Sequence, residues 1–286
     1  MKLKVFYIFA IFSVASLFGD ALVSTEWLKK HKDDSDLRIV LVGDIQKTLI
    51  PNSVATSIGE WRKRKGKYLL LREKSEIEAL IQKLGIDRDS RVVLYSTGAT
   101  NKSLLFSSYV YWALNVYGIK SVSILDGTLK NWVKKKLPTT TKQKIVPKSK
   151  YKAQIDSSIA INIDEVKKSI GEVKMIDARP HKQYFGLESS NGVSRLGHIK
   201  GALSYPWIYS IEKDFKLINK QTLENVFSKG FQFQKNQNLI IYCTGGLETS
   251  FNFFVLHGVL GYKNVKLYDS SMKEWGNRED TEMELF

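Results

Sequence analysis

The chain has 286 residues, of which 43% are hydrophobic and 26% are charged. This composition is typical of a globular protein and excludes a disordered chain, a collagen and a membrane protein with many spans, while the length suits two domains of about 100–150 residues each. The net charge of +15 favours anionic partners without choosing among them. A single cysteine excludes an internal disulfide and a multi-cysteine zinc site.

The N-terminus has the features of a secretory signal peptide. A short basic start precedes an almost wholly apolar stretch over residues 5–18, which is shorter than the ~20 residues that span a bilayer. Small residues at Gly19 and Ala21 suit cleavage after Ala21. We therefore expect residues 1–21 to be a signal peptide, the protein to be periplasmic or secreted, and no stable membrane span to remain after cleavage. An uncleaved anchor is the alternative.

Short apolar runs alternate along the chain with stretches of helical spacing. The runs suit strands that are buried on both faces of a parallel sheet. They lie at residues 38–42, 91–95, 121–125, 173–176, 238–242 and 265–268. The helical stretches lie at residues 75–84, 103–117, 164–170, 221–227 and 248–260. This alternation predicts an α/β fold.

Several patterns occur twice in the same order. Tyr95-Ser-Thr-Gly98 is matched by Tyr242-Cys-Thr-Gly245, and Asp126-Gly-Thr-Leu-Lys-Asn-Trp132 is matched by Asp269-Ser-Ser-Met-Lys-Glu-Trp275. The separation is nearly constant, with 147 residues from position 96 to 243 and 143 residues from position 126 to 269. We interpret the chain as a tandem duplication.

The segment between the copies, residues 137–158, is rich in lysine and contains two prolines and a threonine run. Like charges keep such a segment extended and prolines block helix formation, so it is interpreted as a solvated linker. A polybasic contact for anionic lipid or nucleic acid is the alternative. No aromatic interleaving or recognition-helix pattern accompanies the lysines, so nucleic-acid binding is not expected.

The only cysteine, Cys243, follows a buried run and precedes a glycine loop and a helical stretch. In an open α/β sheet, sites lie at the carboxyl ends of strands. Backbone N–H groups of the loop and the helix N-terminus would stabilise a thiolate and lower its pKa below ~8.5. The first copy has Ser96 at this position, which is poorly ionised, so that copy is expected to act as a scaffold. A buried structural cysteine is the alternative.

The order and spacing of several motifs resemble the rhodanese family of sulfurtransferases in its tandem two-domain form. The motifs are Leu125-Asp-Gly127, Lys130-Asn-Trp132, Ile176-Asp-Ala-Arg-Pro180, Gly197-His-Ile-Lys-Gly-Ala202, Tyr242-Cys-Thr-Gly-Gly246 and Tyr268-Asp-Ser-Ser271 with Glu274-Trp275. The resemblance implies two rhodanese-like domains, each a parallel five-stranded sheet flanked by helices. Residues 22–136 would form the domain without a catalytic cysteine, and residues 159–286 the catalytic domain.

The resemblance also implies a function. Cys243 would take sulfane sulfur from a small anionic donor, thiosulfate or 3-mercaptopyruvate, and pass it as a persulfide to a thiol or cyanide, without a metal or organic cofactor. The loop that starts at Cys243 would bind the substrate and stabilise charge through its backbone. Its other members are Thr244, Gly245, Gly246, Leu247 and Glu248.

Two arginines are the predicted donor contacts, because a guanidinium binds sulfonate or carboxylate oxygens in a bidentate manner. Arg179 follows a predicted strand, and Arg195 precedes the Gly197 motif. For Arg179, a structural pair with Asp177 or Glu188 is the alternative.

Glu248 departs from the family pattern and leaves two interpretations open. Pointing inward, its charge would oppose a thiolate; opening the helix, it would favourably meet the helix dipole. Two other functions also stay open. A non-catalytic sulfur-carrier or binding module of the cell envelope is one. A cysteine phosphatase is the other, although Thr249 occupies the position where that class needs arginine.

Overall fold

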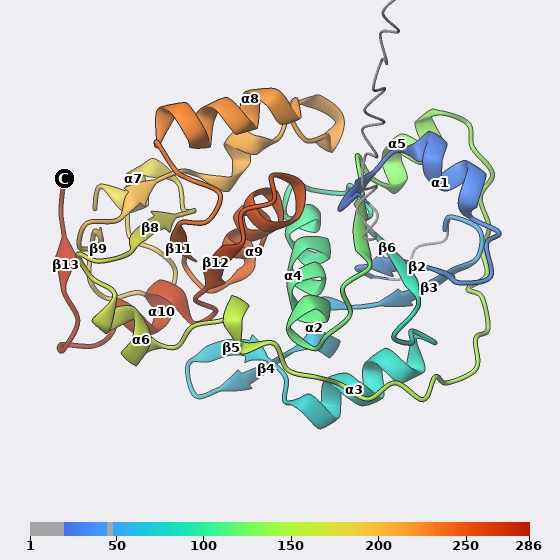
Figure 1. The fold of residues 1–286 in the computed structure, drawn as a ribbon, viewed down its shortest axis with the longest axis horizontal. Helices are drawn as coiled ribbons and strands as arrows, with labels where there is room; N and C mark the ends of the chain where they lie inside the picture. Colours follow the sequence, from blue (N-terminus) through green and yellow to red (C-terminus); the bar gives the residue numbers. More distant parts are fainter. Residues whose placement is uncertain (1–19, 45–47) are drawn as a thin grey trace, which may run out of the picture.

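The computed structural model describes residues 20–44 and 48–286. The predicted signal segment therefore lies outside the described residues, apart from Asp20 and Ala21. Two parallel sheets dominate the fold, one in each half of the chain, and helices cover their faces (Figure 1). The predicted α/β architecture is confirmed.

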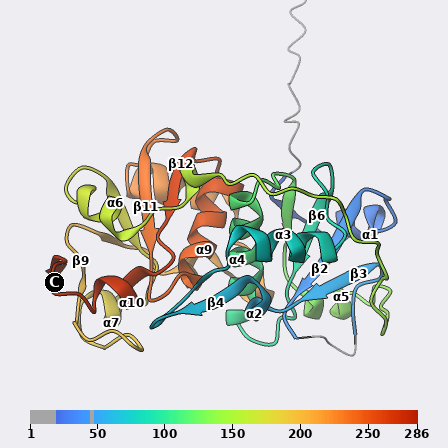
Figure 2. The ribbon, with the colours of Figure 1, turned by 90° about the horizontal axis from the view of Figure 1, so that it is seen from below.

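The first sheet has five parallel strands in the order β1-β7-β6-β2-β3. Its strands are β1 Leu22–Val23, β2 Leu37–Val42, β3 Ser53–Thr56, β6 Arg91–Tyr95 and β7 Val122–Leu125. The helices of this half are α1 Thr25–His31, α2 Ile58–Trp61, α3 Lys74–Lys83, α4 Lys102–Val116 and α5 Leu129–Lys134. An antiparallel hairpin of β4 Arg62–Lys65 and β5 Tyr68–Leu71 leaves the sheet and extends toward the second half (Figure 2).

The second sheet has four parallel strands in the order β10-β8-β11-β12, and a single-residue parallel bridge from Ala160 to Leu267 occupies the fifth place. The strands are β8 Lys174–Asp177, β10 Leu203–Ser204, β11 Asn238–Tyr242 and β12 Asn264–Leu267. A separate antiparallel pair joins β9 His198–Ile199 to β13 Met283–Glu284. The α-helices are α6 Ile163–Lys168, α7 His181–Tyr184, α8 Lys220–Asn225, α9 Leu247–Phe253 and α10 Ser271–Trp275.

Short helical segments complete the second half. Two π-helical segments continue α8 and α9, and three 3₁₀ turns lie in the connections. The π-helical segments are Val226–Gly230 and Phe254–Val259, and the 3₁₀ turns are Ser157–Ile159, Trp207–Ser210 and Lys213–Phe215.

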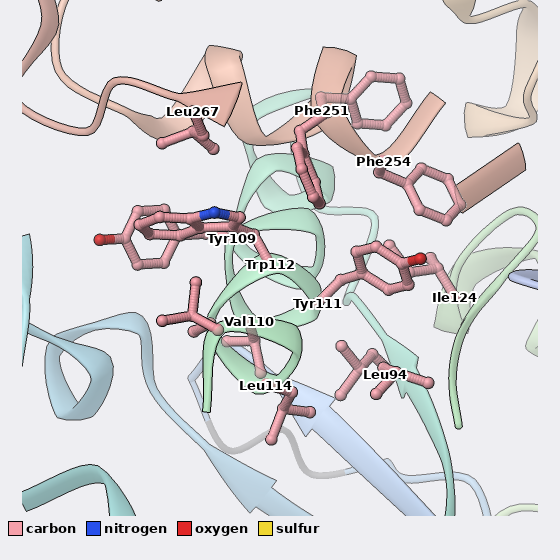
Figure 3. Packing of buried hydrophobic residues seen from close by; sticks show 14 of the residues in the cluster. Leu94, Tyr109, Val110, Tyr111, Trp112, Leu114, Ile124, Phe251, Phe254 and Leu267 are labelled. Carbon is pink, nitrogen blue, oxygen red and sulfur yellow. The ribbon is translucent and has the colours of Figure 1, made fainter. Parts of the chain in front are cut away.

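The two halves share one continuous hydrophobic core across their junction. Helices α4 and α9 lie against each other there, with the Tyr111 ring edge-on to Phe254 at 5.1 Å between centroids (Figure 3). The hydroxyls of Ser108 and Ser250 lie 2.9 Å apart in the same contact. The opposite faces of the two sheets have separate cores, so both sheets are buried on both faces, as their apolar strands predict.

The segment over residues 137–158 is extended, and its lysines are largely exposed. It is not freely solvated, however. Tyr151 is buried and donates its hydroxyl to the Tyr117 carbonyl, while Gln82 on α3 donates to the Tyr151 carbonyl at 2.8 Å. Lys152 also forms an ion pair with Glu78 on α3 at 3.0 Å, so an aromatic side chain and a charged one both hold the segment against the first half.

Candidate active site

The single cysteine stands at the carboxyl end of the central strand β11, directly before a tight loop and α9. The Cys243 sulfur accepts the N–H groups of Gly245 at 3.3 Å and Gly246 at 3.1 Å. Gly246 has φ of +90°, and a Cβ built there would lie 2.1 Å from the Asp269 Oδ1 atom. Only glycine therefore fits this position, which turns the loop so that its N–H groups meet the sulfur.

Residues at the start of α10 hydrogen-bond the backbone of the cysteine loop and hold it in place. The Cys243 N–H donates to the Ser271 hydroxyl at 3.1 Å, and that hydroxyl donates to the Tyr268 carbonyl at 2.6 Å. The N–H groups of Met272 and Lys273 donate to the carbonyls of the first two loop residues at 3.0 and 2.9 Å. The sequence analysis did not predict that Ser271 supports the loop. Ser271 does lie inside the repeated motif over residues 269–275, and this repetition is the sequence feature that could have pointed to it.

Burial changes the expected electrostatics of the thiol. Cys243 is 1% exposed, and this burial raises the pKa of the thiol, with the nearby charge of Glu248 as the second cause. The N–H of Gly245 acts in the opposite direction. The prediction of a lowered pKa is therefore wrong for the unloaded site, because desolvation outweighs the two N–H groups.

Glu248 adopts the inward of its two predicted orientations. Its carboxyl lies near enough to Cys243 for its charge to raise the pKa of the thiol. Burial and the neighbouring charge of Asp177 raise the pKa of Glu248 to about 7, although Arg179 acts against this shift. An ionised Glu248 thus disfavours ionisation of the Cys243 thiol.

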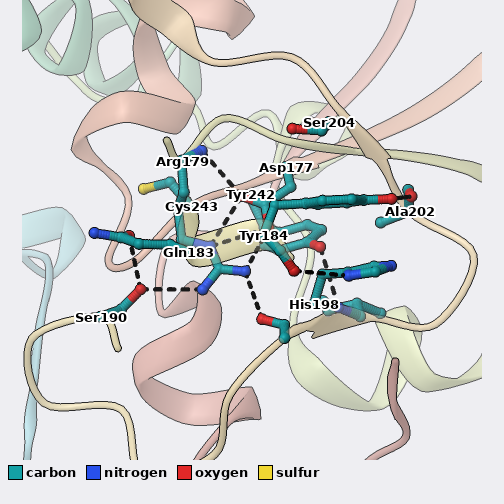
Figure 4. A network of polar contacts seen from close by, with 12 residues as sticks. Asp177, Arg179, Gln183, Tyr184, Ser190, His198, Ala202, Ser204, Tyr242 and Cys243 are labelled. Atoms are coloured by element: carbon teal, nitrogen blue, oxygen red, sulfur yellow. Dashed lines mark hydrogen bonds and ion pairs between the residues drawn. The ribbon is translucent and has the colours of Figure 1, made fainter. Parts of the chain in front are cut away.

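Arg179 is a structural residue rather than a free anion-binding group. It is 1% exposed and forms an ion pair with Asp177 at 2.5 Å (Figure 4). Its other donors reach the Ser190 hydroxyl at 3.0 Å and the Gly197 carbonyl at 2.8 Å. These contacts support the alternative pair with Asp177, because a buried carboxylate requires a partner; donor binding by Arg179 stays a prediction.

Arg195 is likewise occupied by the protein. It donates to the carbonyls of Thr281 at 2.9 Å and Trp275 at 2.8 Å, and also to the Thr281 hydroxyl. Its Nε lies 3.4 Å from the Gly276 carbonyl. The guanidinium therefore ties the C-terminal segment to the Ser194 loop, and a donor contact by Arg195 stays a prediction.

The remaining loop residues lie beside polar groups that the sequence did not highlight. The Thr244 hydroxyl is 3.5 Å from Gln183 Oε1, and Leu247 packs against the shared core. The Lys273 side chain crosses Gly245, with its Cδ 3.3 Å from a Cβ built there. Within the described part of the chain, the Lys273 ammonium has no hydrogen bond or ion pair, so it is available to an anion.

The corresponding loop of the first half is arranged differently. Ser96 is buried and its hydroxyl has no partner among the described residues. The Gly98 N–H donates to the Ser103 hydroxyl at 3.2 Å, and the Ala99 N–H donates to Thr97 Oγ1 at 3.2 Å. These N–H groups do not point at position 96, which agrees with a scaffold role for the first half.

The residues that the structure describes contain no group of three or more His, Cys, Asp or Glu side chains arranged to hold a metal ion. Over the same residues, no helix is both long and apolar enough to cross a membrane.

Known proteins resemble this chain over most of its length. The Rhodanese-like domain family matches residues 162–278. A protein of Mycolicibacterium smegmatis named "Putative thiosulfate sulfurtransferase" is 32% identical over 221 residues, which cover 73% of this chain and 76% of that protein. The sulfur carrier protein TtuD of Thermus thermophilus is 29% identical over 273 residues, covering 90% of this chain and 94% of TtuD.

Solved structures show the same fold. SseA of Escherichia coli, described as a 3-mercaptopyruvate sulfotransferase, superposes with a TM-score of 0.74 at 23% identity, covering 88% of this chain and 98% of SseA. An EanB variant in complex with ergothioneine superposes with a TM-score of 0.81 at 20% identity, covering 93% of this chain and 70% of that one. Together with a lone cysteine at the end of a parallel strand, the sequence relatives establish that the chain belongs to the rhodanese family.

Proposed function

We propose that this protein is a sulfurtransferase in which Cys243 carries sulfane sulfur as a persulfide. The observation that carries this proposal is the position of the only cysteine at the end of β11, with two loop N–H groups directed at its sulfur. The sequence relatives that are named thiosulfate sulfurtransferases support the same reaction class.

The reaction has two half-steps. The Cys243 thiolate attacks the outer sulfur of the donor, so that an Sγ–S bond forms while the bond from that sulfur to the rest of the donor breaks. With thiosulfate, sulfite leaves with the electron pair; with 3-mercaptopyruvate, the carbon–sulfur bond breaks and pyruvate forms after protonation. A thiol or cyanide then attacks the terminal sulfur, and Cys243 leaves again as the thiolate.

The loop supports both half-steps electrostatically. Negative charge lies on or next to Sγ before the first attack and again after the second attack. The N–H groups of Gly245 and Gly246 point at this sulfur and therefore stabilise that charge. The Lys273 ammonium is the basic group proposed to meet the anionic donor in place of Arg179 and Arg195, whose donors are engaged within the protein. Thiosulfate and 3-mercaptopyruvate remain the two candidate donors.

Intact-mass measurement tests the function. The protein is incubated separately with thiosulfate and with 3-mercaptopyruvate, beside a Cys243→Ser variant. We expect one added sulfur with at least one donor, no addition in the variant, and removal of the sulfur by cyanide or a thiol. A folded protein that gains no sulfur from either donor, or a variant that still gains it, would refute the proposal. Loading without any discharge would indicate a sulfur carrier instead.

We also propose that the protein is exported to the periplasm or secreted. Residues 1–21 support this through their basic start, short apolar stretch and small residues before the cleavage point. Expression of the full chain in a bacterium, followed by N-terminal sequencing of the exported fraction, should give Leu22 as the first residue. Retention of the intact chain in the cytosol would contradict the proposal.

A further inference from the structure

One side chain of the first half, that of Arg62, hydrogen-bonds the loop that contains Cys243. Arg62 begins β4 and is 8% exposed. Its Nη2 atom donates to the Gly245 carbonyl at 2.6 Å. The guanidinium lies 4.7 Å from the centre of the Tyr109 ring and 3.7 Å from the Asp269 carboxylate. The contact is buried, charge-assisted and made across the domain junction.

This contact acts on the peptide group that faces the sulfur. The Gly245 carbonyl and the Gly246 N–H belong to the same peptide unit, and that N–H donates to Cys243 Sγ at 3.1 Å. A cationic donor on the carbonyl oxygen polarises the peptide and strengthens its N–H as a donor. It also prevents the peptide from rotating away from the sulfur. The charge of Arg62 is thus transmitted to the thiol without direct contact.

The two halves contact each other through pseudo-symmetric carboxylates. Asp269 of the second half accepts the Leu71 N–H of the first half at 2.9 Å. Asp126 of the first half accepts the Leu217 N–H of the second half at 3.0 Å. Both aspartates begin the repeated motif, so this pair of contacts is a feature of the duplication and not of the reactive site.

The guanidinium contact breaks this symmetry. Leu71 pairs with Arg62 in the first half, and Leu217 forms the corresponding antiparallel bridge with Ile211 in the second half. Ile211 has no donor that could reach the loop of Ser96. The charged contact is therefore directed only at the loop that holds the cysteine, which indicates a role connected with reactivity rather than with domain packing alone.

We propose that Arg62 is a positioning residue for Cys243, so that the half without a cysteine supplies part of the reactive site of the other half. The inference rests on the proposed role of Cys243 as the nucleophile. It explains what the first half contributes beyond burying α4 against α9. Arg62 acts through the Gly245–Gly246 peptide by stabilising the thiolate and fixing the direction of one N–H.

The test is the pH dependence of Cys243 alkylation by iodoacetamide, which needs no sulfur donor. In Arg62→Gln, we expect the thiol pKa to rise and the alkylation rate at pH 7.5 to fall about tenfold, which corresponds to one pKa unit. Arg64→Gln is the matched control, because Arg64 lies on the same hairpin, is exposed and forms no hydrogen bond or ion pair with the loop among the described residues. A profile in folded Arg62→Gln that coincides with that of Arg64→Gln would overturn the proposal.

A second pair of variants separates reactivity from folding. Removing Arg62 alone leaves Asp269 as an uncompensated buried charge, which can unfold the protein. Asp269→Asn keeps an acceptor for Leu71, so Arg62→Gln/Asp269→Asn is compared with Asp269→Asn alone. The same tenfold decrease is expected between these two, and equal rates would refute the role of Arg62. If the wild-type protein gains no sulfur from either donor while the tenfold difference in alkylation is found, the proposed function fails and the positioning role of Arg62 stands.

Discussion

The carboxyl group of Glu248 lies beside Cys243, the residue with which its own loop begins, and its charge helps to raise the pKa of that thiol. The pKa of each group is raised, in the first place by burial; the second cause is the charge of Glu248 for Cys243 and the charge of Asp177 for Glu248. Both groups are therefore harder to ionise in this site than in water. Among the charged side chains, Glu248 is the one that most strongly disfavours the thiolate form of Cys243 when it is ionised.

Replacing the carboxyl of Glu248 with an amide should activate the cysteine. In Glu248→Gln the opposing charge is lost, so the pKa of Cys243 should fall by about one unit and its alkylation rate at pH 7.5 should rise about tenfold. Iodoacetamide kinetics as a function of pH measure this. The exposed Glu279→Gln serves as the control and should leave the profile unchanged. Slower alkylation in Glu248→Gln would show that the carboxylate instead assists the thiol as a base.

Glu248 should also make stability depend on pH. Its pKa rises from 4.5 to about 7 on folding, so between these values the folded state binds more protons than the unfolded state. The free energy of unfolding should therefore decrease as pH rises through this window, by about 1–3 kcal/mol from this group. Urea denaturation at pH 4.5 and 7.5 should show a smaller decrease in Glu248→Gln than in the wild type. Equal decreases would contradict the raised pKa.

Arg179 should prove essential for folding stability rather than for donor affinity. Removing it leaves Asp177 buried without its partner, so Arg179→Met should lower the free energy of unfolding by about 3–5 kcal/mol. Urea denaturation measures the loss. The double variant Asp177→Asn/Arg179→Met should recover part of it, because no charge is then left unpaired. A normally stable Arg179→Met with a raised KM for the donor would restore the donor-binding assignment.

Alanine at Gly246 should affect the reactivity of Cys243 as well as the stability of the fold. Gly246 and Gly261 both have positive φ, at +90° and +72°, so alanine at either position should cost about 1–3 kcal/mol of stability through strain. A Cβ at Gly261 meets open space, whereas one at Gly246 meets Asp269. Only Gly246→Ala should therefore also slow Cys243 alkylation. Equal alkylation rates in the two variants would show that Asp269 yields without moving the loop.

A cysteine in the first half should not become a sulfur carrier. The loop N–H groups near Ser96 are directed at Ser103 and Thr97, so a thiolate at this position would lack their stabilisation. The double variant Ser96→Cys/Cys243→Ser should gain no sulfur from thiosulfate or 3-mercaptopyruvate by intact mass. Sulfur at position 96 would show that the loop rearranges around any cysteine placed there.

The sequence by itself determined the fold class and singled out the one cysteine that is proposed as the nucleophile. Buried parallel strands are continuous apolar runs, so strands such as β6 and β11 were predictable within a residue or two. The duplication was visible because Ser96 and Cys243 occupy equivalent loops, and the chain has no other cysteine to consider. Both features depend on the order of residues along the chain, so the apolar runs and the spacing of the repeated motifs were sufficient to predict them.

Only the tertiary structure decided which charged groups face the cysteine. Arg179 and Arg195 both belong to or adjoin motifs of the catalytic half. In the structure, however, Arg179 donates to the Asp177 carboxylate, and Arg195 donates to backbone carbonyls. Glu248 could have pointed either way, and the fold places its carboxyl near Cys243 and Asp177. Arg62 lies in the other half of the chain and reaches Gly245 only after the two halves pack. Side-chain direction and burial depend on contacts between distant segments, which no local pattern encodes.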